Sequence, residues 1–268
     1  MLCVFDIETI PNIDLCKQAF SIEEENALKI CELSFQKQKE KSGSEFLPLY
    51  LHEIISISAV IGDDYGKFIK VGNFGKDKEN FVSEKELLED FFHYFNSKKP
   101  RLVSFNGRGF DMPLLTLKAL KYNLSLEAFY NQENKWENYR SRYSEQFHLD
   151  LMDSLSHYGS VRGLNLNGIC AMTNIPGKFD MSGDLVHAIY YDTTLNEVEK
   201  KSTIDSYCQS DVLNTYWLFL KYEVLKGALS KEQYIEMLQD FLEKLPKNMS
   251  YSSVFMNALE KEISTELV

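Results

Sequence analysis

Two acidic residues near the N-terminus, Asp6 and Glu8, stand two positions apart in the run MLCVFDIETI. Residues at this spacing in a β-strand leave the same face of the sheet, so their carboxylates would lie side by side. Two ionised carboxylates so close repel each other unless a divalent cation or several donors compensate them. The pair alone does not establish a site, because Asp77 and Glu79 repeat it in an expected surface loop and strand ends often carry exposed acids.

A second candidate lies in the segment SFNGRGFDMPLL, where a strand gives way to a glycine-bearing loop and Asp111 begins a helix. Asp111 has an ordinary structural interpretation, because an aspartate at the start of a helix stabilises the helix dipole. The loop nevertheless lets main chain approach a ligand closely, while Asn106 offers an amide and Phe110 a stacking surface. Both interpretations of Asp111 stay open at this point.

The third candidate lies in the segment DSYCQSDVLNTYWLFL, which has the composition of a helix. Tyr207 and Asp211 are four positions apart and therefore share one helix face. The alternative is a half-buried tyrosine beside a solvated acid. No other tyrosine in the chain is followed by aspartate at this spacing. The expected buried stripe of this helix consists of Ile204, Cys208, Val212, Thr215, Phe219 and Tyr222.

Strands and helices must bring these residues together. The first strand is apolar on both faces until Asp6, as in a central strand covered by helices, and ends at Pro11. A helical insertion follows over about residues 13–45, and we expect a capping box of Ser21 and Glu24 to open it. Residues 53–62 and 66–72 predict two strands of a hairpin.

The next elements alternate between helix and strand. A helix is expected from about residue 83 to 95, followed by a strand in RLVSF. The helix that begins near Asp111 should bury Leu114, Leu117 and Leu120. We interpret residues 123–145 as an excursion outside the core. From residue 147 onward helices dominate, and the chain ends in an amphipathic helical tail.

Composition limits the class of protein. A chain of 268 residues with 44% hydrophobic content can bury one generous core. Its net charge of −11 argues against a broad footprint on duplex DNA, but bound divalent cations would reverse the field around a carboxylate cluster. We expect a cytoplasmic protein, because neither a signal peptide nor a membrane span is evident. The five scattered cysteines, Cys3, Cys16, Cys31, Cys170 and Cys208, indicate buried thiols rather than zinc or disulfide sites.

Together, the segments FDIET, NGRGFD and YCQSD resemble the three motifs of the DEDD superfamily of 3′-5′ exonucleases. Asp6 and Glu8 match the first motif, Asp111 the second and Asp211 the third. Tyr207 indicates the tyrosine (DEDDy) branch, because the histidine of the other branch would stand five residues before the last acid, where this chain has a serine.

The chain most closely resembles stand-alone bacterial proteins similar to the proofreading exonuclease domain of family B DNA polymerases. This resemblance covers about residues 1–225, including FHLDLMDSL and NIPGKFDMSGDLV. It implies an α/β, ribonuclease H-like fold, a mixed sheet with helices on both faces. The expected domain spans residues 1–227 with the insertion at 13–45, and residues 228–268 form a helical extension packed on it.

The resemblance also implies a site for two Mg²⁺ or Mn²⁺ ions held by four carboxylates, the oxygen ligands that these ions prefer. Two ions about 4 Å apart would stabilise the attacking and leaving oxygens of phosphodiester hydrolysis. Asp6 would bridge the ions, Glu8 and Asp211 would complete the site that activates water, and Asp111 would hold the second ion. Tyr207 would orient water, because a phenol with a pKa of about 10 stays protonated at neutral pH.

Four further residues are candidate substrate contacts, namely Thr9, Asn106, Phe110 and Lys178. Lys178 lies in the IPGKFD turn, where a solvated loop lysine is the ordinary alternative to a phosphate contact. The expected substrate is the 3′ end of single-stranded DNA, degraded distributively. An RNA-trimming exoribonuclease and a catalytically idle module that holds nucleic-acid ends or a replication or repair protein are the alternatives. Residues 13–45 and 228–268 could dock such a partner.

Overall fold

The fold is built on a mixed five-stranded sheet in the order β3-β2-β1-β4-β5, in a computed structural model that describes residues 1–77, 79–131, 133–178 and 183–266. Its strands are β1 (Leu2–Pro11), β2 (His52–Gly62), β3 (Phe68–Asn73), β4 (Arg101–Ser104) and β5 (His148–Asp150). The first three pair antiparallel, while β4 lies parallel to both β1 and β5. The hairpin predicted over residues 53–72 is therefore confirmed.

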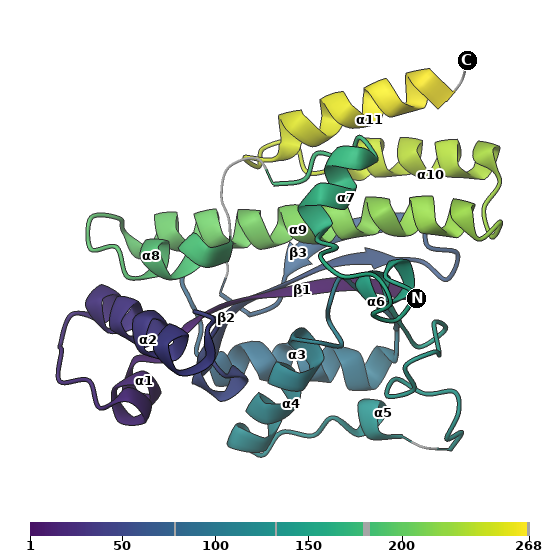
Figure 1. Ribbon diagram of the computed structural model, residues 1–268. Coiled ribbons are helices and arrows are strands. Elements are labelled where there is room, and N and C mark those ends of the chain that lie inside the picture. Colours follow the sequence, from purple (N-terminus) through teal and green to yellow (C-terminus); the bar gives the residue numbers. More distant parts are fainter. Residues whose placement is uncertain (78, 132, 179–182, 267–268) are drawn as a thin grey trace.

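Helices cover both faces of the sheet, as Figure 1 shows. One face carries α3 (Glu84–Lys98), α4 (Asp111–Tyr122) and α5 (Glu127–Tyr130). The other carries α9 (Glu197–Leu225), with α10 (Lys231–Lys244) and α11 (Ser252–Glu266) beyond it and α7 (Leu166–Met172) at its side. The α/β architecture with helices on both faces, predicted from the sequence, is thus confirmed.

The central strand β1 divides its side chains between the two cores. Cys3, Phe5 and Ile7 pack in the cluster of α3 and α4, whereas Leu2 and Val4 pack in the cluster of α9. The strand's two-residue period therefore directs the next even-numbered residues toward α9. The acids of the first motif occupy those positions.

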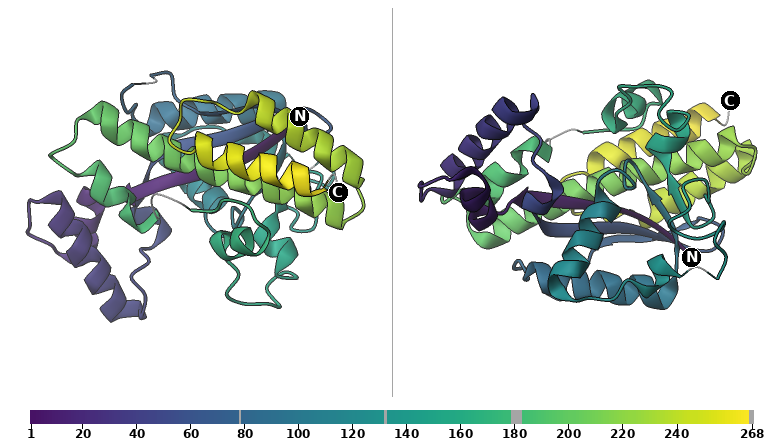
Figure 2. Two further views of the ribbon diagram at one scale, coloured as in Figure 1. Left: turned by 90° about the horizontal axis from the view of Figure 1, so that it is seen from above. Right: turned by 60° about the horizontal axis from the view of Figure 1, so that its bottom comes forward.

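The insertion after β1 forms two helices, α1 (Ile13–Phe20) and α2 (Ala27–Ser42), with a small core of their own. It lies beyond the end of β1 and next to α8 (Val186–Tyr190), at the left of Figure 2's left view. The predicted capping box is wrong. Ser21 ends α1 in a left-handed conformation, and Asn26 caps α2 by accepting from the Lys29 N–H, because the asparagine stands directly before the helix.

Helix α4 turns a different face inward from the one predicted. Leu114 is buried, but Leu117 and Leu120 are 40% and 77% exposed. The helix instead buries Lys118, which forms a 2.9 Å ion pair with the buried carboxylate of Glu84. Hydrophobicity alone misassigned this face, because the ion pair places a charged residue where an apolar one was expected. The buried side chains of α4 are Asp111, Met112, Leu114, Leu115, Lys118 and Ala119.

Three other expectations need correction. Residues 123–145 contribute to the core through Tyr139, whose hydroxyl donates to the Pro100 carbonyl at 2.8 Å. Strand β5 was not predicted, since three residues are too few to show a period. Helix α9 is buried at nearly every position from Ile204 to Leu220 rather than along one stripe, because the sheet and α10 enclose it.

The remaining elements are short. They are η1 (Leu49–Leu51), α6 (Leu151–Leu155) and η2 (Gly183–Leu185). All five cysteines are buried and unpaired, as expected. Among the described residues, no helix has both the length and the apolar character required to cross a membrane.

Candidate active site

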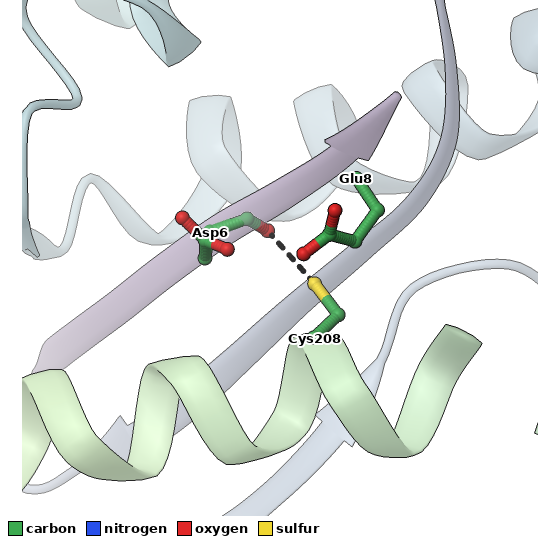
Figure 3. A group of neighbouring side chains, drawn as sticks. All are labelled: Asp6, Glu8 and Cys208. Atoms are coloured by element: carbon green, nitrogen blue, oxygen red, sulfur yellow. Dashed lines mark hydrogen bonds between the residues drawn. The ribbon is translucent and has the colours of Figure 1, made fainter. Parts of the chain in front are cut away.

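The site begins on β1, where the side chains of Asp6 and Glu8 face α9. The ligand atoms of these two residues and of Cys208 on α9 lie within 4.8 Å of one another. Figure 3 shows the Glu8 carboxylate and the Cys208 thiol directed toward each other between strand and helix. A β-bulge follows Glu8, where β1 and β2 shift register, so the strand pairing changes directly after the acids.

Asp111 reaches the same region because β4 leaves the sheet early. Strand β4 pairs with β1 only along Leu2–Val4, and the loop that follows leads directly into α4. Gly107 of this loop is sterically required, whereas a Cβ on Gly109 would meet only the end of the Asn106 side chain, which can move. A Cβ on Gly107 would lie 2.3 Å from the Ser104 hydroxyl oxygen, and one on Gly109 would lie 2.4 Å from the Asn106 amide oxygen.

Asp150 holds this loop in place. Its carboxylate accepts from the main-chain N–H groups of Asn106 at 2.9 Å and Arg108 at 2.8 Å, and it also caps α6. This aspartate belongs to the FHLDLMDSL run, but no local pattern assigned it a role. Its position at the end of β5, beside β4, was the missing information.

Helix α9 supplies the third part of the site. A capping box of Asn196 and Glu199 starts the helix, which then carries Tyr207 and Asp211 buried against the sheet. Lys178 approaches from outside the helix, with its ammonium group 5.4 Å from the centre of the Tyr207 ring. The structure thus places Lys178 near the acids of the site.

The carboxylates perturb one another. Desolvation raises the pKa of Asp6 well above its usual value, and the charges of Asp111, Glu8 and Asp211 raise it further. Desolvation likewise raises the pKa of Glu8 and Asp211, while the charge of Lys178 lowers both. Burial raises the pKa of Asp111 to about 7, despite hydrogen bonding from main chain. Mutual repulsion of this kind is the condition that a bound cation relieves.

Two buried oxygen atoms of the site have no hydrogen-bond partner among the described residues, Oδ1 of Asp111 and Oδ1 of Asp211. A buried carboxylate oxygen is normally paired, so each orphan is costly without a ligand. The carboxylates of Asp6 and Glu8 lie within 4.8 Å of each other, and the charges of the other two acids reach Asp6. Oxygen donors of this kind suit a hard divalent cation. On these two observations, the residues fit divalent metal.

Cys208 is the residue of this site that sequence reasoning missed. Its thiol donates to the main-chain carbonyl of Asp6 with a sulfur to oxygen distance of 3.6 Å. The residue was expected only as part of an apolar stripe, and its position next to Tyr207 was the available signal. Burial and the charges of Asp6 and Glu8 raise its pKa well above the usual value, so the thiol is protonated.

Three of the four predicted substrate contacts line two separate cavities, and Lys178 lines neither. Thr9 and Phe110 line a pocket of about 520 Å³ together with Glu8, Phe46 and His187. Asn106 lines another cleft. The loop between β4 and α4 contributes to both cavities and so stands between them.

Beneath the acids lies a buried polar network that the sequence did not reveal. Asn73 donates to Ser56 and Ser58, the β2 partners of Glu8 and Asp6, at 2.9 and 2.7 Å. Gln209 of α9 donates to Asn73, and Tyr251 donates to Gln209 at 2.5 Å. The network therefore connects the segment before α11 to the strands that carry the site.

A mixed sheet covered by helices on both faces, with carboxylates between its central strand and a long helix, is the architecture of the ribonuclease H-like fold. Residues 44–259 match the family described as predicted 3′-5′ exonucleases related to the exonuclease domain of PolB, and the chain belongs to that family. The matched span begins after the two helices of the insertion, so Asp6 and Glu8 precede it.

Individual relatives agree with this assignment. The chain is 29% identical over 152 residues to a catalytic subunit of DNA polymerase epsilon from Dictyostelium discoideum and 28% identical over 152 residues to one from Arabidopsis thaliana. These matches cover 53% of this chain but 6% of each relative. The family B DNA polymerase from Pyrobaculum calidifontis shares the fold, with a TM-score of 0.51 and 14% identity over 90% of this chain and 29% of that one.

Proposed function

We propose that this protein removes nucleotides from the 3′ end of single-stranded DNA by phosphodiester hydrolysis that depends on two Mg²⁺ or Mn²⁺ ions. One observation carries the proposal. Asp111 and Asp211 each have a buried carboxylate oxygen with no hydrogen-bond partner among the described residues, and β1 supplies two further acids. Asp6, Glu8, Asp111 and Asp211 would hold the ions. Bound ions would lower the pKa of water and stabilise the charge on the leaving oxygen.

Tyr207 has the role of positioning water. Burial and the neighbouring charges of Asp211 and Glu8 raise its pKa far above the usual value of a phenol, so it stays protonated and does not act as a general base. Its hydroxyl can donate to or accept from water one helical turn from Asp211. Tyr207, with a serine where the other branch has its histidine, supports membership of the tyrosine branch of the superfamily.

The pocket beside Glu8 is suited to the 3′-terminal nucleoside. Phe46 and Phe110 meet edge to face with ring centres 5.6 Å apart, and Phe110 lies 5.5 Å from His52. Aromatic surfaces of this kind stack nucleobases. Thr9 lies on the same wall, with its hydroxyl 3.0 Å from the His52 ring nitrogen. Phe46, which directly follows the insertion, therefore takes part in substrate binding.

We also propose that residues 1–227 form the exonuclease domain and that residues 228–268 are an extension integral to it. Tyr234 and Phe241 of α10 support this, because they pack on Trp217 of α9. The Tyr234 hydroxyl accepts from the Trp217 indole at 2.9 Å. The polar network through Tyr251 adds a second connection.

A gel assay tests the proposed activity. A 5′-labelled DNA 12-mer incubated with protein and Mn²⁺ should give a descending ladder that EDTA and Asp6→Ala abolish. Asp77→Ala is the matched control, because Asp77 starts the same acid spacing in an exposed loop and should leave the ladder unchanged. A ladder on RNA alone would reassign the substrate to RNA. Binding of the 12-mer without any cleavage would instead show an idle module.

A further inference from the structure

A cleft of about 650 Å³ adjoins the loop between β4 and α4 and shares no residue with the aromatic pocket, the one lined by Phe46 and Phe110. The chain has five arginines, all between positions 101 and 162. Three of them, Arg108, Arg142 and Arg162, line this one cleft. Among the described residues that line it, Asp153 is the only carboxylate. In a protein with a net charge of −11, this is a local concentration of positive charge.

The three arginines differ in what they already bind. Arg108 donates to three main-chain carbonyls of residues 139–148, so it forms part of the floor. Arg142 forms a bidentate pair with Asp153 at 3.0 and 2.6 Å. Arg162 is exposed and, within the described parts of the chain, has neither a hydrogen bond nor an ion pair. Its guanidinium is therefore free to bind a ligand.

The surroundings of Arg162 leave room for a ligand. Gly159 and Gly163 lie on either side of it in the chain with φ angles of 89° and 82°, and a Cβ on either would have no atom within 4 Å. The lining of the cleft also includes Asn106 and Gly109, which lie in the loop that leads directly to Asp111. A DNA strand lying in this cleft would therefore pass over the loop to reach the acids.

We propose that this cleft binds the phosphodiester backbone of the DNA strand on the 5′ side of the scissile bond, with Arg162 as its unpaired cation. This deepens the proposed function and rests on it. The terminal nucleoside would occupy the aromatic pocket beside Glu8, and the preceding phosphates would cross the loop at Asn106. Guanidinium groups recognise phosphate through paired donors, so they suit a phosphodiester backbone.

Two measurements with one pair of variants test the cleft. Arg162→Ala removes the free cation, and Arg140→Ala is the matched control, because Arg140 is also exposed but lies outside the cleft, 5.0 Å above the Tyr130 ring. Fluorescence anisotropy of labelled dT12 with Ca²⁺ in place of Mn²⁺ measures binding. We expect Arg162→Ala to weaken binding by about fivefold to tenfold and to reduce the slope of log K against log salt by about 0.7.

The second measurement is hydrolysis. The value of kcat/KM should fall more for dT12 than for the p-nitrophenyl ester of thymidine 5′-phosphate, which is too short to reach the cleft. Equal dT12 affinities of Arg162→Ala and wild type would overturn the cleft proposal, whatever the activity. If wild type cleaves neither substrate but Arg162→Ala still binds dT12 more weakly than wild type does, the cleft proposal is supported and the proposed nuclease activity is refuted.

Discussion

The ammonium group of Lys178 lies 5.4 Å from the centre of the Tyr207 ring, and its charge lowers the pKa of Asp6, Glu8 and Asp211. Removing that charge should raise the pKa of all three acids, so a higher pH is required to ionise them for metal binding. We expect Lys178→Ala to shift the onset of activity to higher pH, and Lys178→Arg to restore it.

Rate against pH at fixed Mn²⁺ measures this shift. Lys247→Ala is the control, because Lys247 lies in the turn between α10 and α11 and is not among the charges that shift the pKa of these acids. If the profiles of wild type and Lys178→Ala differ only in height, Lys178 acts on the phosphate and not on the carboxylates.

A second prediction separates the roles of Tyr207 and Asp6. Tyr207→Phe keeps the ring and removes the hydroxyl, so it should reduce the single-turnover rate by about 10- to 100-fold through poorer positioning of water. Asp6→Ala should abolish the activity, because it removes a central acid of the cluster. A Tyr207→Phe variant as inactive as Asp6→Ala would mean that the hydroxyl takes part in proton transfer itself.

The sequence predicted the elements that carry the acids but not what surrounds them. Asp6 and Glu8 lie where the two-residue period of β1 placed them, because strand geometry is local. Asp150 and Cys208 acquire their roles only when β5 lies beside β4 and α9 lies across β1. Such contacts form between segments that are far apart in the sequence, and the periodicity of a single segment cannot predict them.

The same reason explains the errors in α4 and in residues 123–145. Lys118 is buried because Glu84, which lies on another helix, neutralises it. Tyr139 enters the core because the Pro100 carbonyl accepts from its hydroxyl. In both cases a polar group is buried by a distant partner that no local pattern shows.

A third prediction concerns stability and pH. The folded-state pKa of Asp111 is raised from 3.8 to about 7. A group with a raised pKa stabilises the fold fully below its unfolded pKa, and that contribution is lost as pH rises through the folded pKa. The metal-free protein should therefore lose stability between about pH 4 and pH 7, by an amount on the order of 1 to 4 kcal/mol.

Asp111→Asn should reduce this loss, because an amide does not ionise. Thermal unfolding in EDTA at pH 5 and pH 8 measures the effect, and added Mn²⁺ should raise the Tm of wild type at pH 8 more than that of the variant. A pH dependence of Tm that is identical in wild type and Asp111→Asn would refute the assignment of the titration to this residue.

A fourth prediction tests the extension at residues 228–268. Tyr251→Phe should cost about 1 to 3 kcal/mol of unfolding free energy, because it leaves the buried Gln209 amide oxygen without its donor. A chain ended at residue 227 should fail to fold, since Trp217 and Tyr216 would lose the cover of Phe241. Urea unfolding of the full chain should show one transition, and two separate transitions would show that the extension folds independently.

The thiol of Cys208 gives the last prediction, which concerns metal selectivity. Its sulfur lies with the carboxylates of Asp6 and Glu8 in a group that spans 4.8 Å, and a soft cation binds a thiolate sulfur more strongly than Mg²⁺ does. Cd²⁺ should therefore inhibit the Mg²⁺-supported reaction, with release of the thiol proton on binding. Cys208→Ser should weaken the inhibition roughly tenfold. Cys170→Ser, which changes another buried cysteine outside this group, is the control, and equal Cd²⁺ sensitivity of the two variants would exclude sulfur from the site.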